Sequence, residues 1–166
     1  TNLSMALNLG IYTTDLSYAS LFDQTQTTLN YIEVAKKMAD GLNILDAIDE
    51  STIQRLEDNI NNREVIIDII SETLLNSSSY LKEQGLESTA TIVLVGGWIE
   101  GLHIATNLVG DAPIDNNRIV DRIVDQKLSV DIMISLLEEA GDDPDAQKVL
   151  EDIRNLKATF DKITIE

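Results

Sequence analysis

The chain has 166 residues, 43% of them hydrophobic and 25% charged, which is the composition of an ordinary globular domain. Its 29 acidic and 12 basic residues give a formal net charge of −17. Such a surface repels phosphate backbones and anionic lipid headgroups, so nucleic-acid binding and electrostatic membrane docking are disfavoured. The sequence has no cysteine, which excludes disulfides, thiolate catalysis and cysteine–zinc sites.

Only two prolines and eight glycines interrupt long periodic segments, so the sequence predicts an all-α fold. The length suits one domain, and no linker or shift in composition divides it. We therefore expect a single helical-bundle domain over residues 1–166. The segment that begins at Thr1 lacks the features of a signal peptide, so we expect any leader or lipid anchor to precede it.

The first helix is predicted over about residues 2–21, where apolar residues follow a 4-3-4-3 spacing. These residues are Met5, Leu9, Tyr12, Leu16 and Ala19. The second helix is expected to begin at Asp23, which can form a capping box with Gln26, and to end near Gly41.

A third helix is predicted to run without interruption from Ser51 to Gly85. Ser51 with Gln54 repeats the capping signal, and the apolar seam keeps its period over the whole length. Asn76–Ser79 consists of weak helix formers, so we expect a bend or a frayed turn there.

Residues 89–110 are the most apolar segment, and they carry two apolar stripes at helical spacing. A helix that is apolar on two faces has neighbours on most sides, so this segment is predicted to be the central helix of the bundle. Gly97-x-x-x-Gly101 removes two side chains one turn apart, which lets another backbone approach closely. Glu100 and His103 interrupt the apolar run near its middle, which favours a core helix over a transmembrane span.

Beyond the break at Gly110–Pro113, two further helices complete an antiparallel bundle of about six. The turn between them contains Asp143 as the predicted N-cap and Pro144 as the first helical residue. The last helix repeats the 4-3-4-3 spacing from Val149 to Ile163.

The two halves of the chain share one pattern. Gly10-x-Tyr12-x-x-x-Leu16 matches Gly96-x-Trp98-x-x-x-Leu102 at a constant offset. This match indicates duplication of a three-helix unit, although apolar helices also match by chance.

The candidate site centres on Glu100 and His103, which are three residues apart and project from one helix face. Glu-x-x-His is half of the motif of di-iron bundles, but a single histidine cannot complete that site within one chain. The simpler interpretation is that the pair hydrogen-bonds within itself or to neighbouring helices. The alternative is an interior metal or small-ligand site, with no cofactor predicted. Its expected wall residues are Tyr12, Asp15, Tyr18 and Trp98.

The blocks Ala6–Leu16 and Gly96–Ala105 resemble a group of uncharacterised exported proteins, often lipoproteins, of Bacteroidetes-type bacteria. The similarity extends through Gln126-Lys127 to the Asp142–Pro144 turn. It implies a helical domain outside the cytoplasm, periplasmic or associated with the outer membrane. It supplies no catalytic residues.

Three functional hypotheses follow. The first is a non-enzymatic domain of the cell envelope that acts through a groove for a partner protein or ligand, because no serine lies in a nucleophile-elbow motif and phosphate-binding glycine loops are absent. The second is the interior Glu100/His103 site. The third is a structural module that oligomerises through an exposed apolar face.

Overall fold

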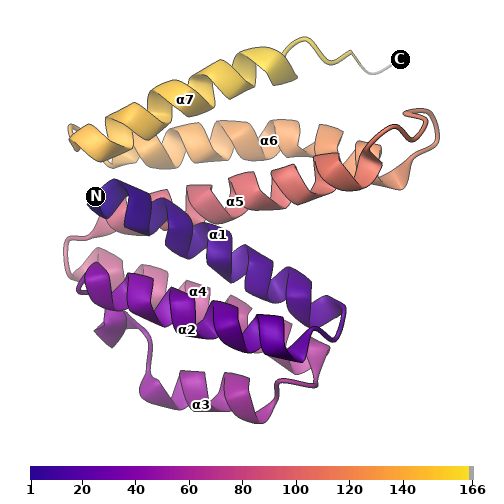
Figure 1. Cartoon of the computed structure of the whole chain (residues 1–166). Helices are drawn as coiled ribbons and strands as arrows, with labels where there is room; N and C mark the ends of the chain where they lie inside the picture. The colour runs from indigo at the N-terminus through magenta and orange to yellow at the C-terminus, as the bar shows by residue number, and fades with distance from the viewer. Residues whose placement is uncertain (165–166) are drawn as a thin grey trace. The chain divides into compact units, whose positions relative to one another are not determined.

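The computed structural model describes residues 1–164 and, over these residues, contains seven α-helices and no strand (Figure 1). This confirms the predicted all-α bundle. The helices are α1 (Asn2–Leu21), α2 (Thr25–Gly41), α3 (Glu50–Asp58), α4 (Arg63–Glu83), α5 (Glu87–Val109), α6 (Arg118–Glu139) and α7 (Pro144–Phe160), with a short 3₁₀ turn η1 (Leu45–Ala47) after α2.

The chain consists of two compact units, unit 1 (Thr1–Glu100) and unit 2 (Gly101–Glu166). Their boundary falls inside the continuous helix α5 rather than in a loop. No linker therefore marks the division in the sequence, which was predicted as one domain.

Of the predicted helix caps, the one at Asp143 is confirmed and those at Asp23 and Ser51 are wrong. The predicted cap of α7 is confirmed, because the Asp143 carboxylate accepts from the Ala146 N–H at 2.9 Å and Pro144 opens the helix. The predicted cap at Asp23 is wrong, since this residue adopts a φ of 53° in the turn before α2. The cap at Ser51 is also wrong, because Asp49 accepts from the Ser51 N–H at 3.0 Å.

The predicted helix from Ser51 to Gly85 is two helices, α3 and α4. Asn62 caps α4 by accepting from the Val65 N–H, and such asparagines favour turns because their side chains compete for backbone groups. The bend expected at Asn76–Ser79 is absent, and α4 is helical throughout. The Ser77 hydroxyl donates to the Ala47 carbonyl at 2.7 Å, so it links α4 to η1 without breaking the helix.

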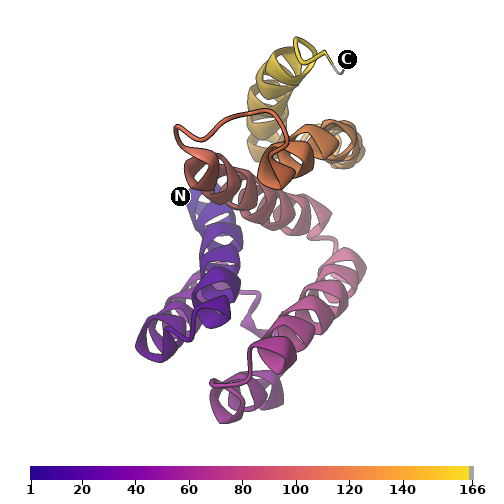
Figure 2. The ribbon, with the colours of Figure 1, turned by 90° about the vertical axis from the view of Figure 1, so that its right-hand side faces the viewer.

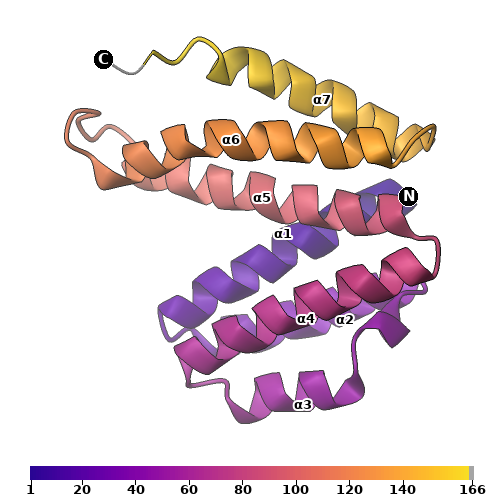
Figure 3. The same ribbon diagram turned by 180° about the vertical axis from the view of Figure 1, so that it is seen from behind.

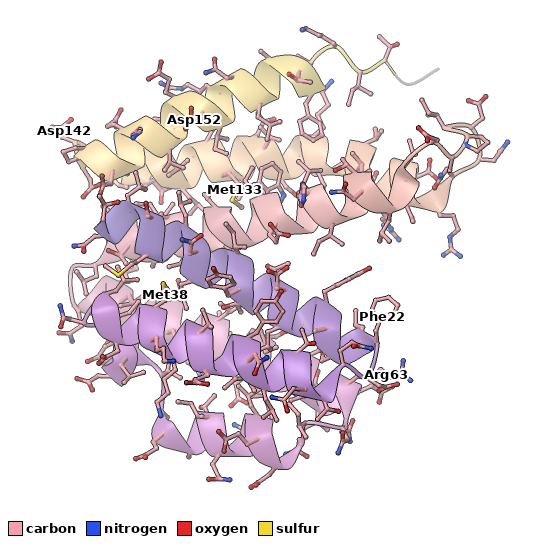
Figure 4. The ribbon with its side chains drawn as sticks, viewed as in Figure 1. Phe22, Met38, Arg63, Met133, Asp142 and Asp152 are labelled. Carbon is pink, nitrogen blue, oxygen red and sulfur yellow. The ribbon has the colours of Figure 1, made fainter. Side chains whose placement is uncertain are left out.

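In unit 1, α1 and α2 pack along each other, and α4 packs against α1, α3 and η1. Figure 2 shows the α1–α2 pair on one side of this unit and the α3–α4 pair on the other. The apolar core is divided into two clusters. Cluster A contains Leu16, Ile32, Leu56, Ile66, Ile69 and Ile70. Cluster B contains Leu9, Ala39, Ile44 and Leu81, with Met38 among the half-buried residues packed against it (Figure 4).

Helices α1 and α5 cross at glycines, with no room for a side chain between the backbones. A Cβ atom on Gly10 would overlap the carbonyl oxygen of Val93, and one on Gly96 would overlap the carbonyl of Leu7. The Thr14 hydroxyl donates to the Gly97 carbonyl at 3.0 Å across the same crossing. The close approach predicted at Gly97 is therefore confirmed, and Gly96, which was not part of that prediction, makes the tighter contact.

The other predicted contact glycine, Gly101, does not take part in this crossing. It is exposed, and among the described residues no atom lies within 4 Å of where its Cβ would be. The prediction was wrong here because sequence spacing identifies glycines on one face but not the point at which a second helix crosses that face.

The glycine contacts at the crossing are reciprocal. Gly96 lies 86 residues after Gly10, and Val93 lies 86 residues after Leu7. Gly10 faces the carbonyl of Val93, and Gly96 faces the carbonyl of Leu7, so the two contacts are equivalent under this offset. Contacts exchanged in this way are characteristic of segments related by a two-fold axis. The reciprocity favours the duplication predicted from the sequence.

The expectation that α5 is enclosed on most sides is wrong. Its buried residues are Ile92, Val95 and Gly96, whereas Leu94 and Leu108 are 45% and 54% exposed. By length and mean hydropathy, 1.5 over an 18-residue window, α5 is the one described helix that could cross a membrane. Core helices and signal sequences pass the same test, so no transmembrane segment is assigned.

In unit 2, α6 and α7 form an antiparallel pair joined at Gly141, whose φ is 67° (Figure 3). Two ion pairs connect the helices. Lys157 lies 2.9 Å from Asp131, and Arg154 lies 2.7 Å from Glu138. These side chains are largely exposed, so each pair contributes only about 0–1 kcal/mol and most of the stability comes from the apolar faces.

We expect Gly10→Ala to lower the free energy of unfolding by about 1–3 kcal/mol or more, because the added methyl group forces α1 away from α5. Urea denaturation followed by circular dichroism measures the change. Gly101→Ala is the matched control, for which the gain in helix propensity is expected to raise stability by up to about 1 kcal/mol. Equal effects of the two substitutions would contradict the crossing.

Candidate functional site

Three of the predicted site residues meet around a tyrosine of α2. The ring centroids of Tyr12 and Tyr31 are 6.0 Å apart, and Tyr31 forms a side-chain hydrogen bond with Asp15. Burial raises the pKa of Tyr31 above 10.0, and the negative charges of Asp15 and Glu100 raise it further. Helices α1, α2 and α5 thus bring two carboxylates and two phenols together, a group that we call the tyrosine–carboxylate cluster (Tyr12, Asp15, Tyr31 and Glu100).

The remaining predicted site residues lie elsewhere. Tyr18 packs against Phe22 at the end of α1, with their rings tilted and the ring centroids 4.9 Å apart. Figure 4 shows Phe22 close to Arg63, whose guanidinium donates to the Leu21 carbonyl at 3.3 Å. Trp98 is half-buried on α5.

The prediction that Glu100 and His103 turn inward together is wrong for His103. The His103 side chain is exposed, and the Asn107 amide nitrogen lies 3.1 Å from its Nε2 and donates to its carbonyl oxygen at 2.8 Å. Helical spacing places residue 103 on the same face as Gly96, but about 10 Å further along the axis. The close crossing with α1 is local, so sharing a face with Gly96 does not bury the imidazole.

A metal site finds no support in the described residues. Within 1–164, no group of three or more His, Asp or Glu side chains is arranged to hold an ion. Tyr31 already provides the hydrogen-bond partner of Asp15, so the tyrosine–carboxylate cluster satisfies its own polar groups. Its arrangement is that of a structural hydrogen-bond network between helices.

The feature that sequence reasoning missed is a cavity of about 160 Å³ inside unit 1. Helices α1 to α5 and the η1 turn all contribute to its wall, and fifteen of its twenty-one lining residues are apolar. An engineered apolar cavity of about 150 Å³ binds benzene or xenon. The cavity of unit 1 therefore has the size and character of a site for a small apolar group.

Residues of both core clusters line the cavity. Leu16, Ile32 and Ile70 of cluster A lie on its wall together with Leu9 and Leu81 of cluster B. Native interiors contain few voids larger than a water molecule. If it were closed and unfilled, a space of this size would cost on the order of 4 kcal/mol, at about 24 cal/mol per Å³.

The hydroxyl groups on the wall leave the cavity apolar. Those of Thr13, Thr73 and Ser77 donate to main-chain carbonyl oxygens at 2.6–2.7 Å. Their hydrogens are therefore not available to a ligand, and the wall offers mainly van der Waals contacts.

The mouth of the cavity is marked by exposed residues of three helices. Leu74 of α4 and Leu94 of α5 line the cavity and are 42% and 45% exposed. Lys36 of α2 is the only charged residue among those that line it, within the described part of the chain. Lys36, Leu74 and Leu94 are exposed as well as lining the cavity, so the space is open to solvent beside these residues.

A sequence signal for the cavity exists in α4. Large aliphatic side chains stop at Leu75 and resume at Leu81, and on the inward face Thr73 and Ser77 occupy two successive turns between Ile70 and Leu81. These short side chains leave space that longer ones would fill.

We expect Asp15→Asn to lower the pKa of Tyr31 towards 10.0, since it removes the nearest charge and weakens the hydrogen bond while burial remains. The ultraviolet absorbance of tyrosinate during alkaline titration measures this, and Tyr31→Phe identifies the signal.

The same raised pKa predicts how stability depends on pH. A folded-state pKa above the unfolded value stabilises the fold fully below pH 10.0, and this stabilisation is lost as pH rises through the folded pKa. In the alkaline titration described above, an unchanged pKa of Tyr31 in the Asp15→Asn variant would contradict the tyrosine–carboxylate cluster.

Comparison of the chain with protein-family models, with curated proteins and with solved structures found no match. A function for the chain must therefore be inferred from the cavity and the residues that form it.

Proposed function

We propose that this chain is a non-enzymatic helical domain that binds an apolar small molecule in the cavity of unit 1. The observation that carries the proposal is an apolar cavity of about 160 Å³ whose wall is formed by residues of both core clusters. A ligand in this space would contact both clusters at once.

The energetics favour uptake of apolar atoms. Each Å² of apolar surface removed from water contributes roughly 25 cal/mol, and a preformed cavity needs little rearrangement of the protein. The ligand would also offset part of the cost of the empty space. Binding should therefore stabilise the fold of unit 1.

The chemistry of the wall supports binding rather than catalysis. Among the described residues, none of those that line the cavity is a histidine, aspartate or glutamate, so no imidazole or carboxylate base faces the space. Three of the five wall hydroxyls, those of Thr13, Thr73 and Ser77, are held by main-chain carbonyls, and a serine or threonine needs an adjacent base to act as a nucleophile.

We further propose that the domain acts in the cell envelope, periplasmic or associated with the outer membrane, and that the full-length protein is a lipoprotein. This proposal is supported by the resemblance of the blocks Ala6–Leu16 and Gly96–Ala105 to exported helical proteins. Its test is fractionation of cells that express the native gene, in which recovery in the cytoplasmic fraction would overturn it.

Toluene is a suitable probe for the cavity. We expect saturating toluene to raise the melting temperature of the wild-type chain by several degrees, as a ligand that binds only the folded state must. Ala35→Leu and Ala47→Leu place three extra carbon atoms on two different parts of the wall and should abolish the shift.

The matched control is Ala158→Leu, the same substitution at an exposed position of α7. It should retain the full shift. The proposed function is wrong if toluene leaves the wild-type melting temperature unchanged, or if both cavity variants respond like the wild type.

A further inference from the structure

Resting on the proposed function, we infer that the ligand is amphipathic and anionic: a medium-chain fatty acid whose alkyl tail fills the cavity and whose carboxylate pairs with Lys36 at the mouth. The carboxylate is the part of the ligand that decides specificity, and the tail supplies the affinity.

The charges around the cavity carry the inference. The chain has 29 acidic residues and a net charge of −17, yet no acidic residue of the described chain lines the cavity. The single charged residue on the wall is cationic. In so acidic a protein, a cation on an otherwise uncharged apolar wall offers an anionic headgroup a partner of the opposite sign.

Lys36 is available for this role. Its neighbour Lys37 is held by Glu33 at 2.7 Å, whereas Lys36 forms no ion pair within residues 1–164. A lysine stem can lie along apolar surface while its ammonium group stays in water. Lys36 can therefore contact both the tail and the head of one ligand.

The headgroup must remain outside the apolar wall. A carboxylate placed deep in the cavity would lose its water and gain few donors, because the hydroxyl hydrogens of Thr13, Thr73 and Ser77 are engaged. At the mouth it keeps water on one side and forms a charge-assisted hydrogen bond on the other. This places the polar end of the ligand at Lys36 and the apolar end inside.

The size of the cavity sets the length of the tail. By comparison with the cavity of about 150 Å³ that takes up benzene, the enclosed space holds roughly six to eight carbon atoms. The first carbons next to the carboxylate would lie along the Lys36 stem. Affinity should thus rise from hexanoate to decanoate and change little for longer acids.

Isothermal titration calorimetry below the micellar concentration tests the inference with three ten-carbon probes: decanoate, decanol and decyltrimethylammonium. We expect the wild type to bind decanoate roughly two- to fivefold more tightly than decanol, the range for an exposed ion pair, and the cationic probe more weakly than either. Because the net charge disfavours anions elsewhere, such a preference isolates the effect of Lys36.

Lys36→Gln should abolish the preference for decanoate over decanol while leaving decanol affinity within about twofold. Lys37→Gln is the matched control and should keep the preference, since this neighbour does not line the cavity. Ala35→Leu should lose both probes, which shows that they occupy the cavity.

The outcomes separate the two proposals. Equal affinity of the wild type for decanoate and decanol, tighter binding of the cationic probe, or equal loss in the two lysine variants would overturn the fatty-acid inference and leave apolar binding intact. Failure of decanol to bind, together with no effect of toluene, would overturn the proposed function itself.

Discussion

The contact between the backbones of α1 and α5 is the constraint on which the described site depends. Because Gly10 and Gly96 carry no side chain, the two helices approach until main-chain atoms touch. That separation brings Glu100 of α5 close to Tyr31 and Asp15, which the packing of α1 against α2 places together. The same helices also contribute to the cavity wall, α1 through residues such as Leu9 and α5 through residues such as Val93. A wider crossing would alter both features at once.

The two features have opposite physical characters. The tyrosine–carboxylate cluster contains groups that are costly to bury unless they are paired, and Tyr31 and Asp15 pair with each other. The cavity wall is mostly apolar, with fifteen apolar residues among the twenty-one that line it, so it offers mainly van der Waals contacts. A satisfied network holds helices in place, whereas an unfilled apolar space creates an affinity for whatever fits. The proposed ligand is therefore placed in the cavity, although three of the predicted site residues lie in the tyrosine–carboxylate cluster.

Local signals allowed much of the secondary structure to be predicted, and tertiary features were the ones missed. The ends of α1, the start of α7 at Asp143 and the extent of α5 follow from caps, periodicity and breaks within a few residues. The division between α3 and α4 was missed because Ile60 maintains the apolar period across the asparagine-rich turn. His103 was wrongly predicted to be buried, because residue spacing shows which face of a helix a side chain lies on but not how far it is from the point where another helix crosses. The short side chains of Thr73 and Ser77 in α4 are a sequence signal for the cavity, but its position and size could not be predicted, since they depend on the separation of helices that no single segment encodes.

The reciprocal contacts between α1 and α5 have a consequence for how this chain can change over time. A larger side chain at residue 10 moves α5 away, and the carbonyl of Leu7 then no longer needs a glycine opposite it. The two glycines are therefore energetically coupled, and a second substitution should cost less than the first. A surface that fits its own copy in this way is also what a half-length ancestor would need to pair with itself. Fusion of two such halves would have made that pairing independent of concentration.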